Sequence, residues 1–452
     1  MTIRRSAGLI REQSISRRLA EYVAHMWLRR FAIGAFACAT AGCGAGETVT
    51  GTAPAASSGG SNGGTASPGP SAGSSSNPTG APEGGASANP SPSVSAAASA
   101  SPGITSGGPL CLPIAPSSSL APAQPLRFGV DVGLAGNLTP VSTTTPVPID
   151  PSKEATALAD LRPPSGTLVV RLNRLFWSGG EPLLQQFAQE AQMYAQSGYD
   201  VEVQVRYMPP AGDVDDISAW VAYVRHVVDV LGPNQQLVAL TITNEVNFNV
   251  SPNTSDGIYP GAQDALIQGI EAAADEAQKD GFGSRMKMGF TFAYRFDPAT
   301  DAELFDYIGS TGGNAFRSAL GFVGIDDYPG TIYPPAYPPG DTAAKEVSEA
   351  IATMRDCYLP LAGITSSVPL WITENGYTSA SSTASQVTSL TGTIDTVRAL
   401  SGTYGVTDYR WFNFRDNDSS GTGTFDQDGL LYDTYAPKPS YPVYRAEIQK
   451  SS

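Results

Sequence analysis

The chain has 452 residues, a formal net charge of −15 and only two histidines, His25 and His226. A chain this acidic lacks the basic face that phosphate backbones require, so we expect no nucleic-acid partner. Two isolated imidazoles argue against a Ser-His-Asp triad and against hydrolytic zinc sites. Catalysis, if present, must therefore rest mainly on carboxylates, Tyr, Asn and Arg.

Residues 1–43 are predicted to form a secretory leader. Arg29 and Arg30 precede a run of apolar and small residues, 31–42, which is too short to span a membrane. A buried apolar helix is the alternative interpretation of this run. The segment TAGC that ends at Cys43 resembles the bacterial lipobox, in which the cysteine is lipidated. This resemblance implies lipidation at Cys43, export across the cytoplasmic membrane and lipid anchoring at the extracytoplasmic face or cell surface.

Residues 44–110 are predicted to be a disordered tether. The segment is rich in Gly, Ser, Pro and Ala and contains no aromatic residue, no Lys and no Arg. Such a composition cannot bury enough apolar surface to offset the conformational entropy of the chain. The tether would therefore hold residues 111–452 away from the membrane.

From Leu126 onward, short β-rich apolar runs alternate with amphipathic helical patterns. The predicted strands span 126–133, 167–173, 201–207, 237–245, 286–294, 321–328, 369–375 and 408–414. The predicted helices span 151–161, 181–198, 216–232, 261–281, 300–310, 342–361, 384–400 and 440–450. This alternation predicts an α/β fold, a TIM (β/α)8 barrel over residues 111–452, which we expect to be a monomer. An open doubly wound sheet is the alternative, but no Gly-rich phosphate turn follows the first strand.

Cys111 and Cys357 are the two cysteines outside the leader. In an exported protein they predict one disulfide, with two buried free thiols as the alternative. In a barrel, Cys111 precedes the first strand and Cys357 lies near the end of the sixth helix. Both positions lie toward the N-terminal face, as a bridge requires.

Polar residues gather at the C-terminal ends of the predicted strands, where barrel enzymes carry their chemistry. Glu245 ends the fourth strand and Glu374 the seventh. A carboxylate pair can cleave a glycosidic bond, because one group protonates the leaving oxygen while the other attacks the anomeric carbon or activates water. Asn173 and Tyr294 are further candidates for substrate contacts. No cluster of metal ligands is visible in the sequence, and we expect neither a metal nor a cofactor.

The sequences TNE at Glu245 and ITENG at Glu374 resemble those of clan A glycoside hydrolases, which are retaining (β/α)8 enzymes. The resemblance extends over about 126–450 and includes the C-terminal GL and PKPSY segments. It implies hydrolysis of β-linked O-glycosidic bonds in an oligo- or polysaccharide, with Glu245 as acid/base and Glu374 as nucleophile. It further implies four contacts: Asn244 with the sugar 2-hydroxyl, Arg171 and Tyr328 with the nucleophile, and Trp411 as the floor of the sugar site.

The sixth strand departs from the clan pattern. It carries Asp326 where an HxY pattern would place histidine. This departure motivates one alternative function, a non-catalytic glycan-binding lipoprotein built on a decayed barrel. A transglycosylase that remodels a cell-surface polysaccharide is a second alternative.

Overall fold

The computed structural model describes residues 110–133, 145–294, 297–332 and 336–451. The predicted leader, the candidate lipidation site Cys43 and tether residues 44–109 lie outside the described residues. Within the described residues, no helix combines the length and apolar character that a membrane crossing would need.

Eight parallel strands close into a barrel in the order of the sequence. The strands are β1 (Arg127–Asp131), β2 (Val169–Phe176), β3 (Asp200–Arg206), β4 (Leu237–Ile242), β5 (Lys287–Ala293), β6 (Leu320–Asp326), β7 (Leu370–Glu374) and β8 (Val406–Trp411). β8 pairs with β1 and so closes the ring. The prediction of a TIM (β/α)8 barrel is confirmed.

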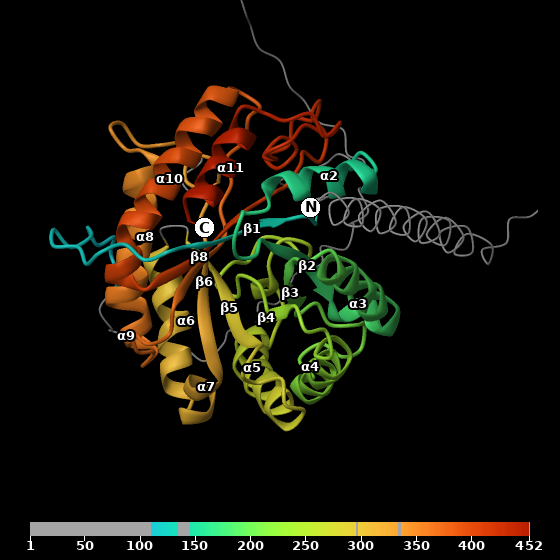
Figure 1. The fold of residues 1–452 in the computed structure, drawn as a ribbon. Helices are drawn as coiled ribbons and strands as arrows, with labels where there is room; N and C mark the ends of the chain where they lie inside the picture. Colours follow the sequence, from blue (N-terminus) through green and yellow to red (C-terminus); the bar gives the residue numbers. More distant parts are fainter. Residues whose placement is uncertain (1–109, 134–144, 295–296, 333–335, 452) are drawn as a thin grey trace, which may run out of the picture. The chain divides into compact units, whose positions relative to one another are not determined.

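Helices surround the strands, as Figure 1 shows. They are α2 (Pro151–Leu161), α3 (Gly180–Gln196), α4 (Ile217–Leu231), α5 (Ala262–Lys279), α6 (Pro298–Thr311), α7 (Asn314–Ala319), α8 (Ala343–Thr353), α9 (Leu359–Leu361), α10 (Thr383–Tyr404) and α11 (Ser440–Lys450). Short 3₁₀ turns lie at Trp177–Gly179 (η1) and Asp256–Ile258 (η2), and a π-helical segment (η3, Met354–Tyr358) joins α8 to α9. The single helix predicted over 342–361 is therefore three segments, and α7 was not predicted.

Local sequence signals explain where these helices start and which face they bury. Asp150 caps α2 by accepting from the Ser152 and Lys153 amides, and Pro151 stands at its first turn. In α4, Trp220 and Val224 lie one turn apart on the buried face. This apolar stripe packs the helix onto the barrel.

β4 and β8 each end three residues earlier than predicted, and both ends matter for the site. β4 stops at Ile242 rather than 245, because Thr243 (φ 67°) and Glu245 (φ 49°) adopt left-handed backbone conformations that are incompatible with a strand. β8 covers 406–411 rather than 408–414. The chain therefore leaves the barrel three residues before the sequence pattern suggested.

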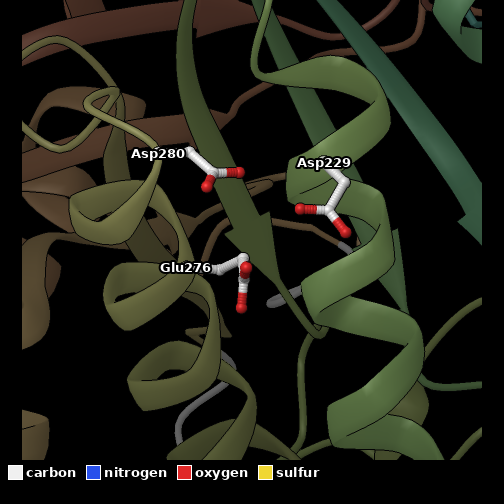
Figure 2. A group of neighbouring side chains, drawn as sticks. All are labelled: Asp229, Glu276 and Asp280. Carbon is white, nitrogen blue, oxygen red and sulfur yellow. The ribbon is translucent and has the colours of Figure 1, made fainter.

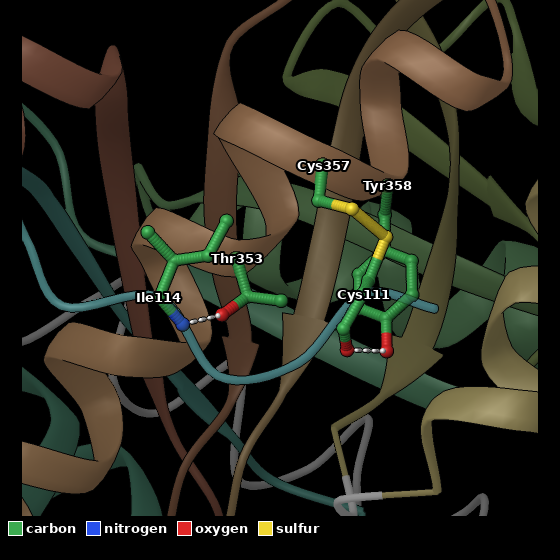
Figure 3. Close-up of a disulfide and its surroundings, with 5 residues drawn as sticks. All are labelled: Cys111, Ile114, Thr353, Cys357 and Tyr358. Atoms are coloured by element: carbon green, nitrogen blue, oxygen red, sulfur yellow. Dashed lines mark hydrogen bonds between the residues drawn. A yellow bond between two sulfur atoms is a disulfide. The ribbon is translucent and has the colours of Figure 1, made fainter. Parts of the chain in front are cut away.

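Residues 110–125, here called the N-terminal strap, run along helices at the N-terminal side of the strands. A disulfide joins Cys111 to Cys357 with a Cα–Cα distance of 5.7 Å (Figure 3). The Ile114 amide donates to Thr353 Oγ1 at 2.8 Å, and the Gln124 amide donates to Ser401 Oγ at 2.7 Å. The strap is thus held covalently at one end and by side-chain acceptors of α8 and α10 along its length.

Replacing Cys357 by serine is expected to lower the free energy of unfolding by about 2–5 kcal/mol, because the bond closes a loop of 246 residues and restricts the unfolded chain. Guanidinium chloride titration of the barrel measures the loss. Cys111→Ala and the double variant serve as controls, since each removes the same bond and should lose the same amount. Additive losses in the double variant would contradict this prediction.

Candidate active site

A cavity of about 240 Å³ opens at the C-terminal ends of the strands. Its wall includes residues from the ends of β2, β3, β5, β6 and β7 and from the segments that follow β4 and β8. Glu245 and Glu374 both line it. One carboxylate oxygen of each, together with one of Asp326, lie within 4.8 Å of one another. Three acids from three strand ends therefore converge in one enclosed space.

Glu374 is the last residue of β7 and is held on both of its oxygens. Arg171 Nη1 donates to Oε1 at 2.6 Å, and the Tyr328 hydroxyl donates to Oε2 at 2.6 Å. A guanidinium and a phenol at these distances form strong charge-assisted hydrogen bonds with the carboxylate. The side chain is thereby fixed with its end in the cavity.

Strand register explains why Arg171 reaches Glu374. Asp131 of β1, Arg171 of β2 and Glu202 of β3 are partners across neighbouring strands, so they lie at one level of the barrel interior. Arg171 donates to Asp131 Oδ2 and to Glu202 Oε1, each at 3.1 Å, and is fully buried. Burial raises the pKa of Asp131 to about 8, although Arg171 acts in the opposite direction. The guanidinium is thus shared by three acidic side chains.

The segment around Glu374 is shaped by its two following residues. Asn375 Nδ2 donates to the Asp327 carbonyl at 2.7 Å, and the Tyr409 hydroxyl donates to Asn375 Oδ1 at 2.6 Å. A Cβ at Gly376 would lie 2.3 Å from the Phe412 carbonyl oxygen, so only glycine fits there. The ENG sequence is therefore required by packing around the nucleophile candidate as well as by its chemistry.

Glu245 lies in the left-handed turn that follows β4. Its amide donates to Thr291 Oγ1 at 3.3 Å and its carbonyl accepts from the Phe248 amide at 2.8 Å. Burial raises the pKa of Glu245 well above its ordinary value, and the charges of Asp326 and Glu374 raise it further. A non-glycine residue in this conformation is costly and is typical of functional sites. The turn aims a carboxyl group that favours its protonated form into the cavity.

Asn244 is held beside Glu245 by three contacts. Its Oδ1 accepts from Gln204 Nε2 at 2.5 Å and from Thr291 Oγ1 at 3.0 Å, while its Nδ2 donates to the Thr254 carbonyl at 2.9 Å. These contacts orient the amide so that one Nδ2 hydrogen is left for another acceptor, since an amide nitrogen carries two. Asn244 lines the cavity.

Asp256 braces this region from behind. Its carboxylate accepts from Arg206 Nε at 2.8 Å and from the Tyr207 and Asn244 amides at 2.8 and 2.9 Å. It therefore ties the end of β3 to the turn after β4. The sequence alone did not point to this residue, because it lies twelve positions after Asn244.

The remaining predicted contacts fall into two groups. Asn173 and Tyr294 line the cavity, and Asn173 Nδ2 also donates to Asp131 Oδ2 at 2.9 Å. Trp411 does not line it. Its side chain is fully buried, and its Nε1 donates to the Asp428 carbonyl at 3.1 Å. The prediction that Trp411 floors the sugar site is wrong for this structure.

Two phenylalanines line the cavity where Trp411 was expected. Phe412 directly follows β8, and Phe425 comes from the loop after it. Their ring centroids lie 5.4 Å apart, and those of Phe425 and Tyr328 5.2 Å apart. This edge-to-face group presents an apolar wall beside Glu374.

Sequence reasoning also missed Arg174, Gln204 and Arg206 of β2 and β3, which line the cavity too.

A second group of carboxylates lies on the outer helices. Asp229 of α4, Glu276 of α5 and Asp280 after α5 face one another in Figure 2. Glu276 accepts from Arg225 Nη1 at 3.0 Å and from Lys279 Nζ. Hydrogen bonds from Lys279 and Arg225 lower the pKa of Glu276. Since neighbouring cations already compensate this group, we assign it no site.

Comparison with known proteins finds similarity in structure but not in sequence. No protein-family model matches the chain, and no similar sequence was found among curated proteins. A β-glucosidase from Thermotoga maritima in complex with deoxynojirimycin superposes with a TM-score of 0.52 at 13% identity, covering 74% of this chain and all of that one. The family 1 β-glucosidase from Thermotoga maritima gives the same values. β-Glucosidase 1317 reaches a TM-score of 0.46 at 18% identity, over 66% of this chain and 86% of that one. At these identities, what the chain shares with β-glucosidases is the (β/α)8 barrel.

Proposed function

We propose that the barrel is a retaining glycoside hydrolase that cleaves β-linked O-glycosidic bonds, with Glu374 as nucleophile and Glu245 as acid/base. One observation carries the proposal: the two carboxyl groups meet in a cavity with oxygens within 4.8 Å, in contrasting surroundings. Glu374 is bonded to a guanidinium and a phenol, whereas Glu245 is buried beside other acids. Pairs of carboxyls in contrasting surroundings divide the roles of base and acid.

The separation favours the retaining route over the inverting one. Retaining enzymes hold their carboxyl groups about 5–5.5 Å apart, whereas inverting enzymes leave about 6.5–9.5 Å for a water molecule. One oxygen of Glu245 lies within 4.8 Å of one of Glu374, which is nearer the retaining separation than the inverting one. Glu374 therefore attacks the anomeric carbon itself.

The reaction then follows two steps. A Glu374 oxygen bonds to the anomeric carbon as Glu245 protonates the departing glycosidic oxygen, which gives a glycosyl ester and a free alcohol. Glu245, now ionised, takes a proton from water, whose oxygen attacks the same carbon and releases Glu374. Asn244 donates its remaining Nδ2 hydrogen to the sugar 2-hydroxyl, and Phe412 and Phe425 contact apolar faces of the sugar.

The expected product of this route keeps the configuration of the substrate. We expect the purified barrel to hydrolyse at least one member of a panel of aryl β-glycosides and β-linked oligosaccharides. Proton NMR recorded early in the reaction should show the β-anomer of the sugar first. An α-anomer first would contradict the double displacement, and no hydrolysis across the panel would contradict the function. In the second case, calorimetric binding of an oligosaccharide without turnover would favour the non-catalytic alternative.

We also propose that the enzyme works outside the cytoplasmic membrane, anchored through lipidated Cys43. The leader and lipobox-like segment support export. The Cys111–Cys357 disulfide supports it independently, since disulfides persist in oxidising compartments. The substrate would then be an extracellular or cell-surface oligo- or polysaccharide. Metabolic labelling with a fatty-acid analogue should mark the natural chain and not the Cys43→Ala variant.

A further inference from the structure

Asp326 is a third acid of the cavity that the reaction above does not use. It is the last residue of β6 and is the register partner of Glu374 on β7. Its side chain is 2% exposed and lines the cavity. Thr373 Oγ1 donates to Oδ1 at 2.7 Å, while Oδ2 is buried without a hydrogen-bond partner. A buried carboxylate oxygen without a donor is costly to keep ionised.

The surroundings of Glu374 differ from those of the other two acids, Glu245 and Asp326. Arg171 and Tyr328 both donate hydrogen bonds to Glu374. Among the described residues, Oδ2 of Asp326 has no hydrogen-bond donor, and the Glu245 carboxyl lies beside the acids Asp326 and Glu374. The titratable and charged groups that face this pair are Glu374 and Arg171 toward Asp326, Tyr328 beside it, and Arg206 and Asp256 toward Glu245. Two close, buried carboxyls disfavour ionising together, so the second ionisation of the pair is the costly one.

A metal ion is a poorer occupant than a proton. A cation bound by Glu245, Asp326 and Glu374 would lie next to Arg171 Nη1, which is 2.6 Å from Glu374 Oε1. The guanidinium would repel it, and both Glu374 oxygens already accept hydrogen bonds. A proton between Glu245 and Asp326 meets neither obstacle.

We propose that Asp326 is a positioning residue for the proton of Glu245: the two carboxyl groups share one proton, and the negative charge left on the pair stays beside Glu245 throughout the reaction. The inference rests on the proposed function for its catalytic meaning. Before the first step the negative charges are on Glu374 and on the pair. When Glu374 forms the ester and Glu245 gives its proton to the leaving oxygen, Glu245 and Asp326 carry them instead. The number of charges in the cavity is thus unchanged.

Asp326 assists both steps of the proposed hydrolysis. While Glu245 holds the proton, ionised Asp326 opposes its loss to solvent. Once Glu245 is ionised, Asp326 makes it a stronger base toward the incoming water, because a like charge disfavours the charged form. Burial raises the pKa of Asp326 well above its ordinary value, and Glu374 adds to this. Asp326, which occupies the position where the clan pattern has histidine, therefore has a role in controlling the proton of Glu245.

The test is the pH dependence of Asp326→Asn, which keeps the shape of the side chain and removes its charge. The alkaline limb of kcat/KM reports loss of the last proton from the pair. Without the charge of Asp326, Glu245 releases its proton at lower pH, so this limb should move about one unit toward acid.

Asp327→Asn is the matched control. Asp327 is the next residue, is fully buried and does not line the cavity. Burial raises the pKa of Asp327 well above its ordinary value, and Glu346 adds to this, so its surroundings favour the uncharged form that asparagine mimics. Its alkaline limb should coincide with that of the natural protein. An unshifted limb in Asp326→Asn, or equal shifts in the two variants, would overturn the proposal.

A second readout does not need activity. Carbon-13 NMR of protein labelled at Asp and Glu carboxyls follows each titration directly. Coupling is reciprocal, so Glu245→Gln should lower the pH at which Asp326 titrates by as much as Asp326→Asn lowers that of Glu245. Independent titrations in the two variants would refute the shared proton even in an active enzyme. If the protein hydrolyses no glycoside, reciprocal shifts would still establish the shared proton, while the proposed function would fail.

Discussion

Glu374→Gln should reduce kcat/KM for an activated aryl β-glycoside by on the order of 10⁴-fold or more, because an amide cannot form the glycosyl ester and the remaining groups act only together with the nucleophile. The fold should survive, since glutamine fills the same volume and its Oε1 can still accept from Arg171, which now donates to Glu374 Oε1. Steady-state kinetics and circular dichroism of the purified variant measure both outcomes.

Glu154→Gln is a suitable control for this result. Glu154 is also buried and also accepts from a tyrosine, Tyr194, at 2.7 Å, but it does not line the cavity. It should keep its activity. A 2-deoxy-2-fluoro glycoside should also label the natural protein on the peptide that contains Glu374. Undiminished turnover by a folded Glu374→Gln variant, or a label on another acid, would rule out Glu374 as the nucleophile.

Replacing Arg171 by methionine is the change with the largest expected effect on stability. Arg171 is fully buried and pairs with Asp131, Glu202 and Glu374. Removing one partner from a buried ion pair leaves charge without compensation and costs about 3–5 kcal/mol of unfolding free energy. Chemical denaturation should show this loss, and activity should fall with it because Glu374 loses its guanidinium donor.

Arg445→Met provides the comparison. Arg445 bonds Asp160 at 2.6 Å with both side chains well exposed, so little stability depends on it. Similar unfolding midpoints for the two variants would mean that the buried acids of the barrel protonate or rearrange without cost. That result would argue against a charged network at the centre of the site.

Much of the architecture was readable from periodicity. Eight apolar runs alternate with amphipathic helices, which is typical of a parallel sheet with helical crossovers, and the sheet here is a closed barrel. Because parallel strands end at one face, acids at the ends of the fourth and seventh predicted strands were expected to meet. Their oxygens do lie within 4.8 Å, together with Asp326. The catalytic roles of Glu245 and Glu374 remain proposals.

The cavity-lining residues that could not be predicted from the sequence depend on where each strand ends. Side chains alternate along a strand, so the inward face depends on the register and on the last paired residue. β8 ends at Trp411, and the chain then turns so that Phe412 lines the cavity. No pattern in the sequence distinguishes these two adjacent aromatic residues. Trp411 was therefore chosen on resemblance, and the choice was wrong.

The proximity of Asp326 to Glu245 was hidden for a related reason. The fourth strand was predicted to include Glu245. In a continuous strand, the alternation of side chains between the two faces would have set the direction of the Glu245 side chain. The left-handed residues Thr243 and Glu245 redirect it instead. Such conformations are set by tertiary contacts, here the Asp256 brace and Thr291, and not by local propensity. Loop geometry of this kind therefore could not be predicted from the single sequence.

The N-terminal strap has a mechanical consequence. Tension applied to the chain ahead of Leu110 reaches the fold first at Cys111, which is covalently bound to Cys357. The load therefore passes into the π-helical segment and its neighbours, and it bypasses the hydrogen bonds that hold Ile114 and Gln124. β1, whose pairing with β2 and β8 closes the barrel, lies beyond the covalent link and is not pulled. Oxidised protein should consequently resist shear along its N-terminal direction at forces that peel the strap from a reduced one.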